Sequence, residues 1–543
     1  MKGPKKERFI ELYHEALGLH VRFNALLKPE DGEPISERTF QRRVAQWVHE
    51  RQVPSPAKDD QVDARPVAGG TVEPPDRRRG KLPGRRFVFT SAQNNTFVHH
   101  TFWDNLMTFC EARDAQMVVG QFRYNKAGFQ NHTKVDDQDL WFDPKVLPYV
   151  LSSSMEIEEA TSGLVWCGEL DILPTAVNPL SGLDSYTHTA SSIVPHTKVQ
   201  LKSVPVLRGD PLKMLYTTGA CTQRNYIQRK AGQKAEFHHV FGALFVEIDD
   251  SGEFFVRQLI ADSEGSFYDL TDKFTNGGVE TGHFVEAINW GDIHAELIDP
   301  EVQQRAWGTA DSMMDTLLPA YQFIHDLTDF RARNHHNIKN PHFLAERHFD
   351  DTGNVEVGMI QASALLKQLE RSYCQTIVVE SNHDQAFKRW LAEADIRTDP
   401  ENAVYFHTAN AELHSQIRAG NSRFHVFEWA VRRVAELNNT TFLDEDDSFV
   451  ICGKNGIECG MHGHRGPNGS RGNPNALRNL GRKCNVGHSH TAAIMDGIYV
   501  AGISCQMDMG YNKGPSSWSQ SHIVTYPNGK RAIITMKNGK WRA

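Results

Sequence analysis

The sequence predicts an α/β fold, in which a small helical region and a linker precede an α/β domain and a second, C-terminal α/β domain. Apolar runs of strand length recur from Arg86 onward, and a helical segment separates the first two of them. In the second half of the chain, five such runs are each followed closely by Asp, Asn or His. At about 150 residues per domain, a chain of 543 residues is expected to form two to four domains.

The composition is that of a globular protein. The chain is 39% hydrophobic and 23% charged, and its 59 basic and 67 acidic residues give a net charge of −8. This balance excludes a globally basic, histone-like binder of nucleic acid, but it leaves room for a local basic groove. No apolar run approaches the roughly 18 residues that cross a bilayer. The polar start KGPKKER has no apolar stretch behind it, so we expect no secretory signal and a cytoplasmic protein.

Cysteine and histidine usage indicates what kind of metal site the chain could hold. Eight cysteines are too few and too scattered for a disulfide framework, and the nearest pair, Cys452 and Cys459, lacks zinc-ribbon spacing. Histidine is abundant, with 26 residues, many of them after position 283. A metal site in this chain would therefore use nitrogen and oxygen ligands.

The N-terminal region predicts two helices within residues 1–52. The second would place Phe40, Val44 and Trp47 on one face. The pair could bind DNA, or it could serve as an oligomerisation or docking region. Residues 53–85 are rich in proline, glycine and charge, which predicts a linker.

Residues 86–278 predict an α/β domain of unknown role. Strands are expected in RFVFTSAQ and QMVVGQF, on either side of a helix, and later in HHVFGALFVEID and EFFVRQLIAD, which a DDSG turn joins. No glycine fingerprint follows the first strand, so dinucleotide binding is unsupported.

Residues 279–543 carry the candidate chemistry. Five strand-like segments deliver, in order, Asp292 and His294; Asp326 and Asp329; Asn382, His383 and Asp384; His462 and His464; and His488 and His490. Because the carboxyl ends of strands in a layered sheet share an edge, these side chains should converge. Seven of them as ligands, all with nitrogen or oxygen donor atoms, are what two neighbouring divalent ions require.

The order and spacing of these motifs resemble the calcineurin-like metallophosphoesterase superfamily. Its pattern is Asp-x-His, Gly-Asp-x-x-Asp, Gly-Asn-His-Asp/Glu, a lone strand-end His, and Gly-His-x-His. The resemblance covers roughly residues 283–525 and implies a four-layer αββα catalytic domain over 279–543. His325 and Ser381 stand where the family has glycine, and neither position supplies a ligand in the family.

The resemblance also implies a role for each motif residue. The first metal would bind Asp292, His294, Asp326 and His490, and the second Asp326, Asn382, His462 and His488, with Asp326 as the bridge. His383 would contact the phosphate and help to protonate the leaving oxygen, and Asp384 would orient its imidazole. His462 is preferred to His464 because it comes first after the strand and precedes a glycine. The expected ions are manganese first, with iron, zinc or magnesium as alternatives.

The expected activity is that of a two-metal phosphodiesterase, in which a metal-bridging hydroxide attacks phosphorus in line. The loop 465–483 favours a polyanionic substrate, although a small-molecule phosphatase could use one or two such arginines as clamps. Its basic residues are Arg465, Arg471, Arg478, Arg482 and Lys483. The stretch HDLTDFRA differs from the protein Ser/Thr phosphatases, and the chain looks most like the DNA-processing branch. We therefore expect a Mn-dependent DNA nuclease that acts as a homo-oligomer, with DNA as its partner and no membrane.

A second, narrower resemblance concerns FVFTSAQNNTFVHHTFWDNL. This stretch is similar to phage-encoded proteins that are often labelled transcriptional regulators, among them the pre-early host-DNA-degrading proteins of large tailed phages. It would place the protein in the host cytoplasm, with host DNA as the substrate. Two alternatives stay open. One is a DNA-binding transcriptional regulator with a vestigial metal site, and the other is a small-molecule phosphodiesterase or phosphatase.

Overall fold

A computed structural model describes residue 8 and residues 27–28, 79–124, 140–334, 337–454 and 456–543. The helices expected in 1–52 and most of the expected linker lie outside these residues. The chain divides into two units, and the fold below is that of the unit formed by residues 79–93, 98–124 and 149–543. It is a mixed α/β structure with several sheets, which confirms the predicted fold class at this level. Within the described residues, no helix has both the length and the apolar character needed to cross a membrane.

The first sheet contains the βαβ unit that the sequence predicts. Strands β2 (Arg86–Gln93) and β3 (Gln116–Phe122) pair in parallel, and α4 (His100–Arg113) connects them. Strands β9 (Gly242–Ile248) and β10 (Phe254–Ile260) form the expected antiparallel hairpin, and β9 pairs with β2. A small three-stranded sheet follows, made of β11 (Phe267–Asp269), β12 (Asp272–Thr275) and β13 (Gly278–Glu280).

An eleven-stranded sheet combines strands from both halves of the chain. Its order is β1 (Gly80–Leu82), β4 (Ser154–Ile157), β5 (Leu164–Cys167), β6 (Ser191–Val194), β8 (Lys213–Thr217), β7 (Leu201–Val204), β21 (Ala493–Met495), β22 (Ile498–Val500), β20 (Lys483–Val486), β19 (Ile457–Glu458) and β18 (Val450–Ile451). The junction is the antiparallel pair β7–β21. The segments 86–278 and 279–543, which the sequence predicts as separate domains, therefore share one sheet within one unit.

A six-stranded sheet carries the first three motifs. Its order is β17 (Thr440–Leu443), β16 (Gln375–Val379), β15 (Tyr321–Ile324), β14 (Ala287–Asn289), β23 (Ser521–Thr525) and β24 (Arg531–Thr535). The four strands β14–β17 run parallel, whereas β23 and β24 are antiparallel additions. The parallel pairing places the carboxyl ends of β14, β15 and β16 along one edge.

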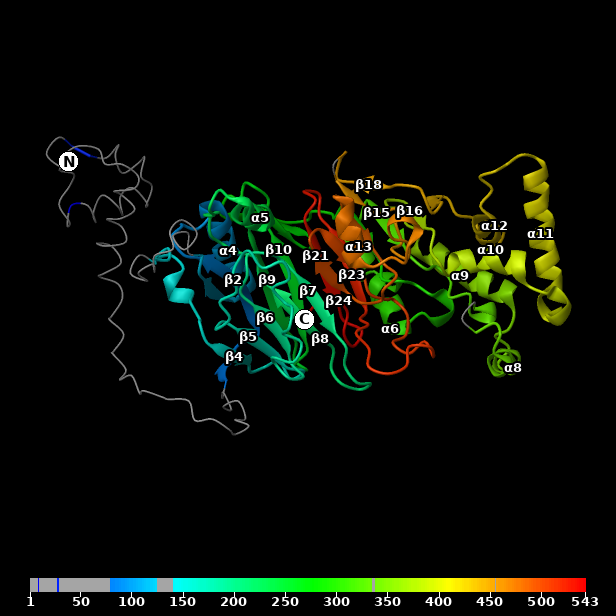
Figure 1. The fold of residues 1–543 in the computed structure, drawn as a ribbon, viewed down its shortest axis with the longest axis horizontal. Coiled ribbons are helices and arrows are strands. Elements are labelled where there is room, and N and C mark those ends of the chain that lie inside the picture. Colours follow the sequence, from blue (N-terminus) through cyan, green and yellow to red (C-terminus); the bar gives the residue numbers. More distant parts are fainter. Residues whose placement is uncertain (1–7, 9–26, 29–78, 125–139, 335–336, 455) are drawn as a thin grey trace. The chain divides into compact units, whose positions relative to one another are not determined.

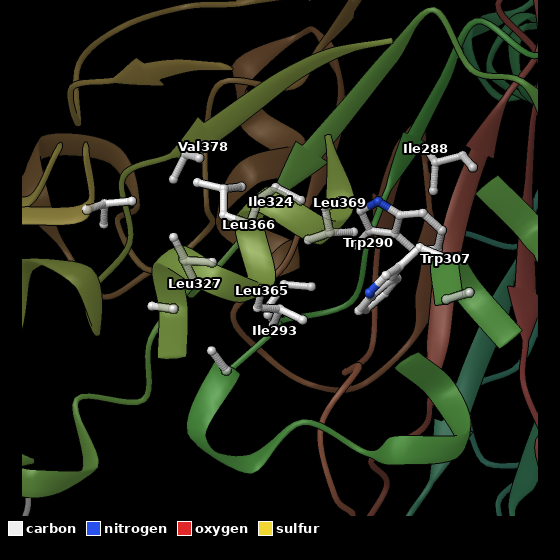
Figure 2. Packing of buried hydrophobic residues seen from close by; sticks show 14 of the residues in the cluster. Ile288, Trp290, Ile293, Trp307, Ile324, Leu327, Leu365, Leu366, Leu369 and Val378 are labelled. Carbon is white, nitrogen blue, oxygen red and sulfur yellow. The ribbon is translucent and has the colours of Figure 1, made fainter. Parts of the chain in front are cut away.

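Both faces of the six-stranded sheet are buried. On one face, Ile324 and Val378 pack with Leu366 of α9, and the rings of Trp290 and Trp307 meet at 5.2 Å (Figure 2). On the other face, Phe323 belongs to a cluster that includes residues of β18 and β19 from the eleven-stranded sheet. Burial on both sides explains why these strands read as continuous apolar runs.

Helices gather beside β15 and β16 (Figure 1). In chain order the α-helices after α4 are α5 (Lys230–His238), α6 (Pro300–Gln303), α7 (Met313–Leu317), α8 (Pro341–Phe349), α9 (Val355–Leu369), α10 (Asp384–Glu393), α11 (Ala403–Arg418), α12 (Val426–Arg432) and α13 (Pro474–Leu477). Leu477 of α13 packs on Val486 and Val500 of the eleven-stranded sheet. The two sheets thus face each other, with helical segments packed on the outside of each.

Candidate metal centre

The candidate centre lies where strand ends from the two sheets meet. Asp292, Asp326 and Asn382 follow the strands β14, β15 and β16 of one sheet, while His462 and the pair His488 and His490 follow β19 and β20 of the other. Backbone hydrogen bonds hold the loops together. The amide of His294 donates to the carbonyl of Asp326 at 2.7 Å, and the amide of Gly487 donates to the carbonyl of His462 at 2.9 Å. The convergence that the sequence predicts is present, but it draws on two sheets.

The residues expected at the first metal form a tight, buried cluster. The ligating atoms of Asp292, His294, Asp326 and His490 all lie within 4.8 Å of one another. Nε2 of His490 is 3.1 Å from Oδ2 of Asp292 and 3.2 Å from Nε2 of His294. Four donors around one point, with no cysteine among them, match the first set of ligands inferred from the sequence.

The residues expected at the second metal adjoin the first cluster through Asp326. Oδ2 of Asp326 lies 3.6 Å from Nε2 of His294 and 3.3 Å from Nε2 of His462, so it faces both groups. Nε2 of His462 is also 3.2 Å from Oδ1 of Asn382. The ring of His488 lies 5.2 Å from that of His462, and the His488 amide donates to Asp292. Asp326 therefore lies between the two groups of potential ligands.

The alternative histidine of the fourth motif lies further from this bridge. The ring of His464 is 5.4 Å from that of His462, and its Nε2 is 2.9 Å from Oε1 of Glu445. This geometry favours His462 as the ligand.

The chemistry of the cluster fits a divalent cation. Oδ1 of Asp292 is buried and has no hydrogen-bond partner among the described residues, while Oδ2 of Asp326 is buried between the ring nitrogens of His294 and His462. Unpaired carboxylate oxygens are costly to bury, and a cation would compensate them. Burial opposes charging of His294, but the nearby carboxylates, first that of Asp329, raise its pKa to about 9. Donors of this kind suit manganese, iron, zinc or magnesium.

Four of the proposed ligands have a left-handed backbone. The φ angles are +47° for His294, +45° for Asp326, +70° for His488 and +58° for His490. Such angles are uncommon outside glycine and are concentrated at functional sites. Close packing adds a second constraint, because a Cβ atom on Gly487 would lie 2.1 Å from Oδ1 of Asp292. Position 487 therefore has room only for glycine.

Asp329 connects the ligand cluster to His383. Its Oδ1 is 3.4 Å from Nδ1 of His294 and 3.5 Å from Nδ1 of His383, and its backbone carbonyl is 3.0 Å from the same His383 nitrogen. Glu296 in turn accepts the amide N–H of Asp329 at 2.7 Å. The sequence places Asp329 in the second motif without a role and does not single out Glu296, whose one signal is its position two residues after His294.

The structure corrects the expected role of Asp384. The sequence assigns this carboxylate to the ring of His383, but Asp329 occupies that place. Asp384 instead accepts the amide N–H groups of Leu327 and Thr328, at 3.3 and 3.1 Å, and the hydroxyl of Ser381 at 2.9 Å. Burial, with the charge of Asp326, raises the pKa of Asp384 to about 7. Its carboxylate holds the loop after β15 in place.

A cavity of about 860 Å³ opens over the cluster. Its polar and aromatic lining residues are Asp326, Asn382, His383, His464, Arg471, Asn473, His488, Ser489, His490, Tyr511 and Trp518, and glycines and the apolar Pro474, Leu477, Val486 and Val500 complete the lining. Of the five basic residues expected to contact substrate, Arg471 lines this cavity.

The other four basic residues are placed differently. Arg465 donates to Glu445 at 2.6 Å, and Arg478 pairs with Asp496. Arg482 is exposed, 3.8 Å from Glu458, and Lys483 is an exposed residue that begins β20. The loop 465–483 is therefore partly neutralised by acidic neighbours that are remote in sequence.

A further group of potential ligands consists of Glu380, His425 and Asp444. Nδ1 of His425 accepts the amide N–H of Glu428 at 3.0 Å, as the cap of α12. In a neutral imidazole the proton then sits on Nε2, the atom that faces Glu380 at 3.6 Å. A protonated nitrogen does not bind a metal, so we do not assign this group as a metal site.

These features define a mixed α/β protein with a buried candidate metal centre at the junction of two sheets. The chain is 43% identical over 517 residues to Protein A1 of Escherichia phage T5, which covers 92% of this chain and 91% of that protein. The chain belongs to the same family as this phage protein. No family model matches the chain, and no solved structure matches it.

Proposed function

We propose that this protein is a two-metal phosphodiesterase that cleaves DNA. The observation that carries the proposal is the position of Asp326, whose Oδ2 lies within 3.6 Å of His294 and 3.3 Å of His462 in a buried site with an adjoining cavity. A carboxylate shared by two groups of nitrogen and oxygen donors is typical of dinuclear hydrolytic centres.

The arrangement of layers supports the same class. Helices, the six-stranded sheet, strands β18–β22 of the eleven-stranded sheet, and α13 follow one another, as in the four-layer αββα domain of calcineurin-like metallophosphoesterases. The position of the motif residues after β14, β15, β16, β19 and β20 supports the same proposal.

Each residue around the cavity would have a separate role in the reaction. Bound divalent ions would stabilise charge on the phosphoryl oxygens and activate water. His383 lines the cavity, and Asp329 fixes its Nδ1, so its Nε2 would donate the proton to the leaving oxygen. Arg471 would bind a phosphate oxygen through its guanidinium group.

DNA is the substrate that the proposal favours. A phosphodiester backbone is polyanionic, and the cavity carries Arg471 on a glycine- and asparagine-rich loop. The phage relative supports a phage origin of the protein. Action on host DNA in the host cytoplasm is part of the proposal, and manganese is the first ion to test. A homo-oligomer is also part of this proposal.

The test is incubation of the purified protein with linear and circular duplex DNA and with a chromogenic phosphate bis-ester, in Mn²⁺, Mg²⁺ or EDTA. We expect Mn²⁺-dependent cleavage of DNA by the wild type and none by Asp326→Asn. Hydrolysis of the bis-ester without DNA cleavage would replace the nuclease by a small-molecule phosphodiesterase. Binding of DNA without hydrolysis of either substrate would favour the regulator.

A further inference from the structure

We propose that Trp518, assisted by Tyr511, stacks an unpaired nucleobase beside the phosphate that is cleaved, so that the site acts on single-stranded or frayed DNA. This inference rests on the proposed function and narrows it to a substrate class. It also assigns a role in substrate binding to Trp518 and Tyr511, two residues that lie outside the five sequence motifs.

The two rings lie in the same cavity as the candidate metal ligands. Trp518 and Tyr511 belong to the segment between β22 and β23, and both line the cavity together with His383 and His488. The ring centroid of Trp518 is 4.3 Å from that of His490, with the planes at 76°. The ring centroid of Tyr511 is 6.1 Å from that of Trp518, and the two planes are inclined at 69°. Both side chains are half-buried, which leaves part of each ring exposed.

The backbone on either side of Trp518 is held against the ligand loop. The hydroxyl groups of Ser517 and Thr491 are 3.0 Å apart, and the amide of Ser519 donates to the carbonyl of His490 at 3.3 Å. The amide of Ile503 donates in turn to the carbonyl of Ser519 at 2.9 Å. A residue whose two neighbours are anchored in this way loses little backbone freedom when a ligand stacks on its ring.

The lining of the cavity matches the parts of a nucleotide. The Asp326 carboxylate, through a cation that it would bind, and Arg471 suit the phosphate. The amide of Asn473 suits polar sugar or base edges, and the two aromatic rings suit the base. A paired base is stacked inside the duplex and reaches such a ring only after leaving the helix. Stacking on Trp518 therefore favours strands whose bases are already unpaired.

A purely structural role for Trp518, in which it only orients His490, makes a different prediction. Loss of the ring would then impair every phosphodiester equally, with or without a base. The two roles are separated by comparing a single-stranded oligonucleotide with an abasic deoxyribose-phosphate oligomer of the same length.

The experiment uses the full chain, with Trp518→Leu, the conservative Trp518→Phe, and Trp429→Leu in α12 as a matched control. We expect Trp518→Leu to raise KM for the oligonucleotide about tenfold. Its effect on KM for the abasic oligomer should be several-fold smaller, Trp518→Phe should recover most of the affinity for the oligonucleotide, and the Trp429→Leu control should stay near wild type. Equal effects on both substrates, or no effect on either, would overturn the inference.

A binding measurement makes the outcome independent of cleavage. Calorimetry with Mn²⁺ compares deoxyadenosine monophosphate with 2-deoxyribose 5-phosphate on the wild type, which we expect to bind the nucleotide more tightly. Equal affinities in the wild type would overturn the inference even if Trp518→Leu does not fold. If the wild type prefers the nucleotide but cleaves no phosphodiester, the proposed function fails, while the role of Trp518 in binding a base is retained.

Discussion

Oδ1 of Asp329 lies 3.4 Å from Nδ1 of His294, a ring whose Nε2 is directed at the candidate metal cluster. The same oxygen lies 3.5 Å from Nδ1 of His383. One carboxylate thus sets the orientation of a proposed ligand and of the proposed acid. Carboxylates behind a metal-binding histidine fix its tautomer and increase its basicity.

Replacing Asp329 should therefore weaken metal binding and catalysis together. We expect Asp329→Asn to lower Mn²⁺ affinity or activity about 10- to 100-fold, because His294 loses the carboxylate behind its Nδ1 and His383 keeps only the backbone carbonyl of Asp329 as its partner. Calorimetric titration with Mn²⁺ and phosphodiester hydrolysis measure the two effects. Asp250→Asn is the control, since the carboxylate of Asp250 is fully exposed and pairs with Arg85. An Asp329→Asn protein with wild-type affinity and rate would contradict the assignment.

A methyl group at Gly487 should displace Asp292. The added Cβ would approach Oδ1 of Asp292 to 2.1 Å, so we expect Gly487→Ala to lose most of its Mn²⁺ affinity. Gly278→Ala is a matched control, because there the Cβ would lie at an ordinary distance of 3.6 Å from the Thr275 carbonyl. Circular dichroism checks that both variants fold. Unchanged metal binding by a folded Gly487→Ala protein would exclude Asp292 from the site.

Asp384 should contribute chiefly to stability. Both of its oxygens accept hydrogen bonds, and an asparagine there would leave a buried amide N–H of Leu327 or Thr328 without an acceptor. We expect Asp384→Asn to lower the free energy of unfolding by about 1–3 kcal/mol. Urea unfolding of this variant and of Asp395→Asn, an exposed control, measures the difference. If stability were unchanged and only catalysis fell, the orienting role that the sequence suggests would be restored.

Buried neutral histidines should make the protein sensitive to acid. Burial lowers the pKa of His196 to about 4, whereas an unfolded histidine titrates near 6.5. Between these values the unfolded chain binds a proton that the folded chain does not. The free energy of unfolding is therefore lost as pH falls from 6.5 towards 4, by about 1.4 kcal/mol per pH unit for this group.

The check is the unfolding midpoint as a function of pH for the wild type, His196→Gln and the exposed control His407→Gln. We expect the pH dependence to be shallower in His196→Gln and unchanged in the control. Parallel curves for all three proteins would show that His196 is not the group responsible.

Removal of the metal should lower thermal stability. A cation that binds only the folded state stabilises it by about 2.7 kcal/mol when present at 100 times its Kd. We expect Mn²⁺ to raise the melting temperature of the wild type, EDTA to reverse the shift, and Asp326→Asn to show none. A shift of equal size in Asp326→Asn would place the bound ion elsewhere.

The sequence by itself determined the local elements of the candidate site. Strands β14, β15 and β16 were predictable because an apolar run followed by a polar residue is a pattern of neighbouring residues, which local geometry converts into a strand and its end. The hairpin of β9 and β10 and the βαβ unit of β2, α4 and β3 were predictable for the same reason. The ligand types followed from the residues at these strand ends.

The tertiary structure alone decided how these elements meet. The ends of β19 and β20 belong to a different sheet from those of β14–β16, and the pairing of β7 with β21 joins segments that composition separates. It also decided that Asp329, and not the neighbour Asp384, faces His383, because α10 begins at Asp384 and its carboxylate meets the loop after β15. Contacts between residues remote in sequence depend on packing of whole layers, and local patterns do not encode them.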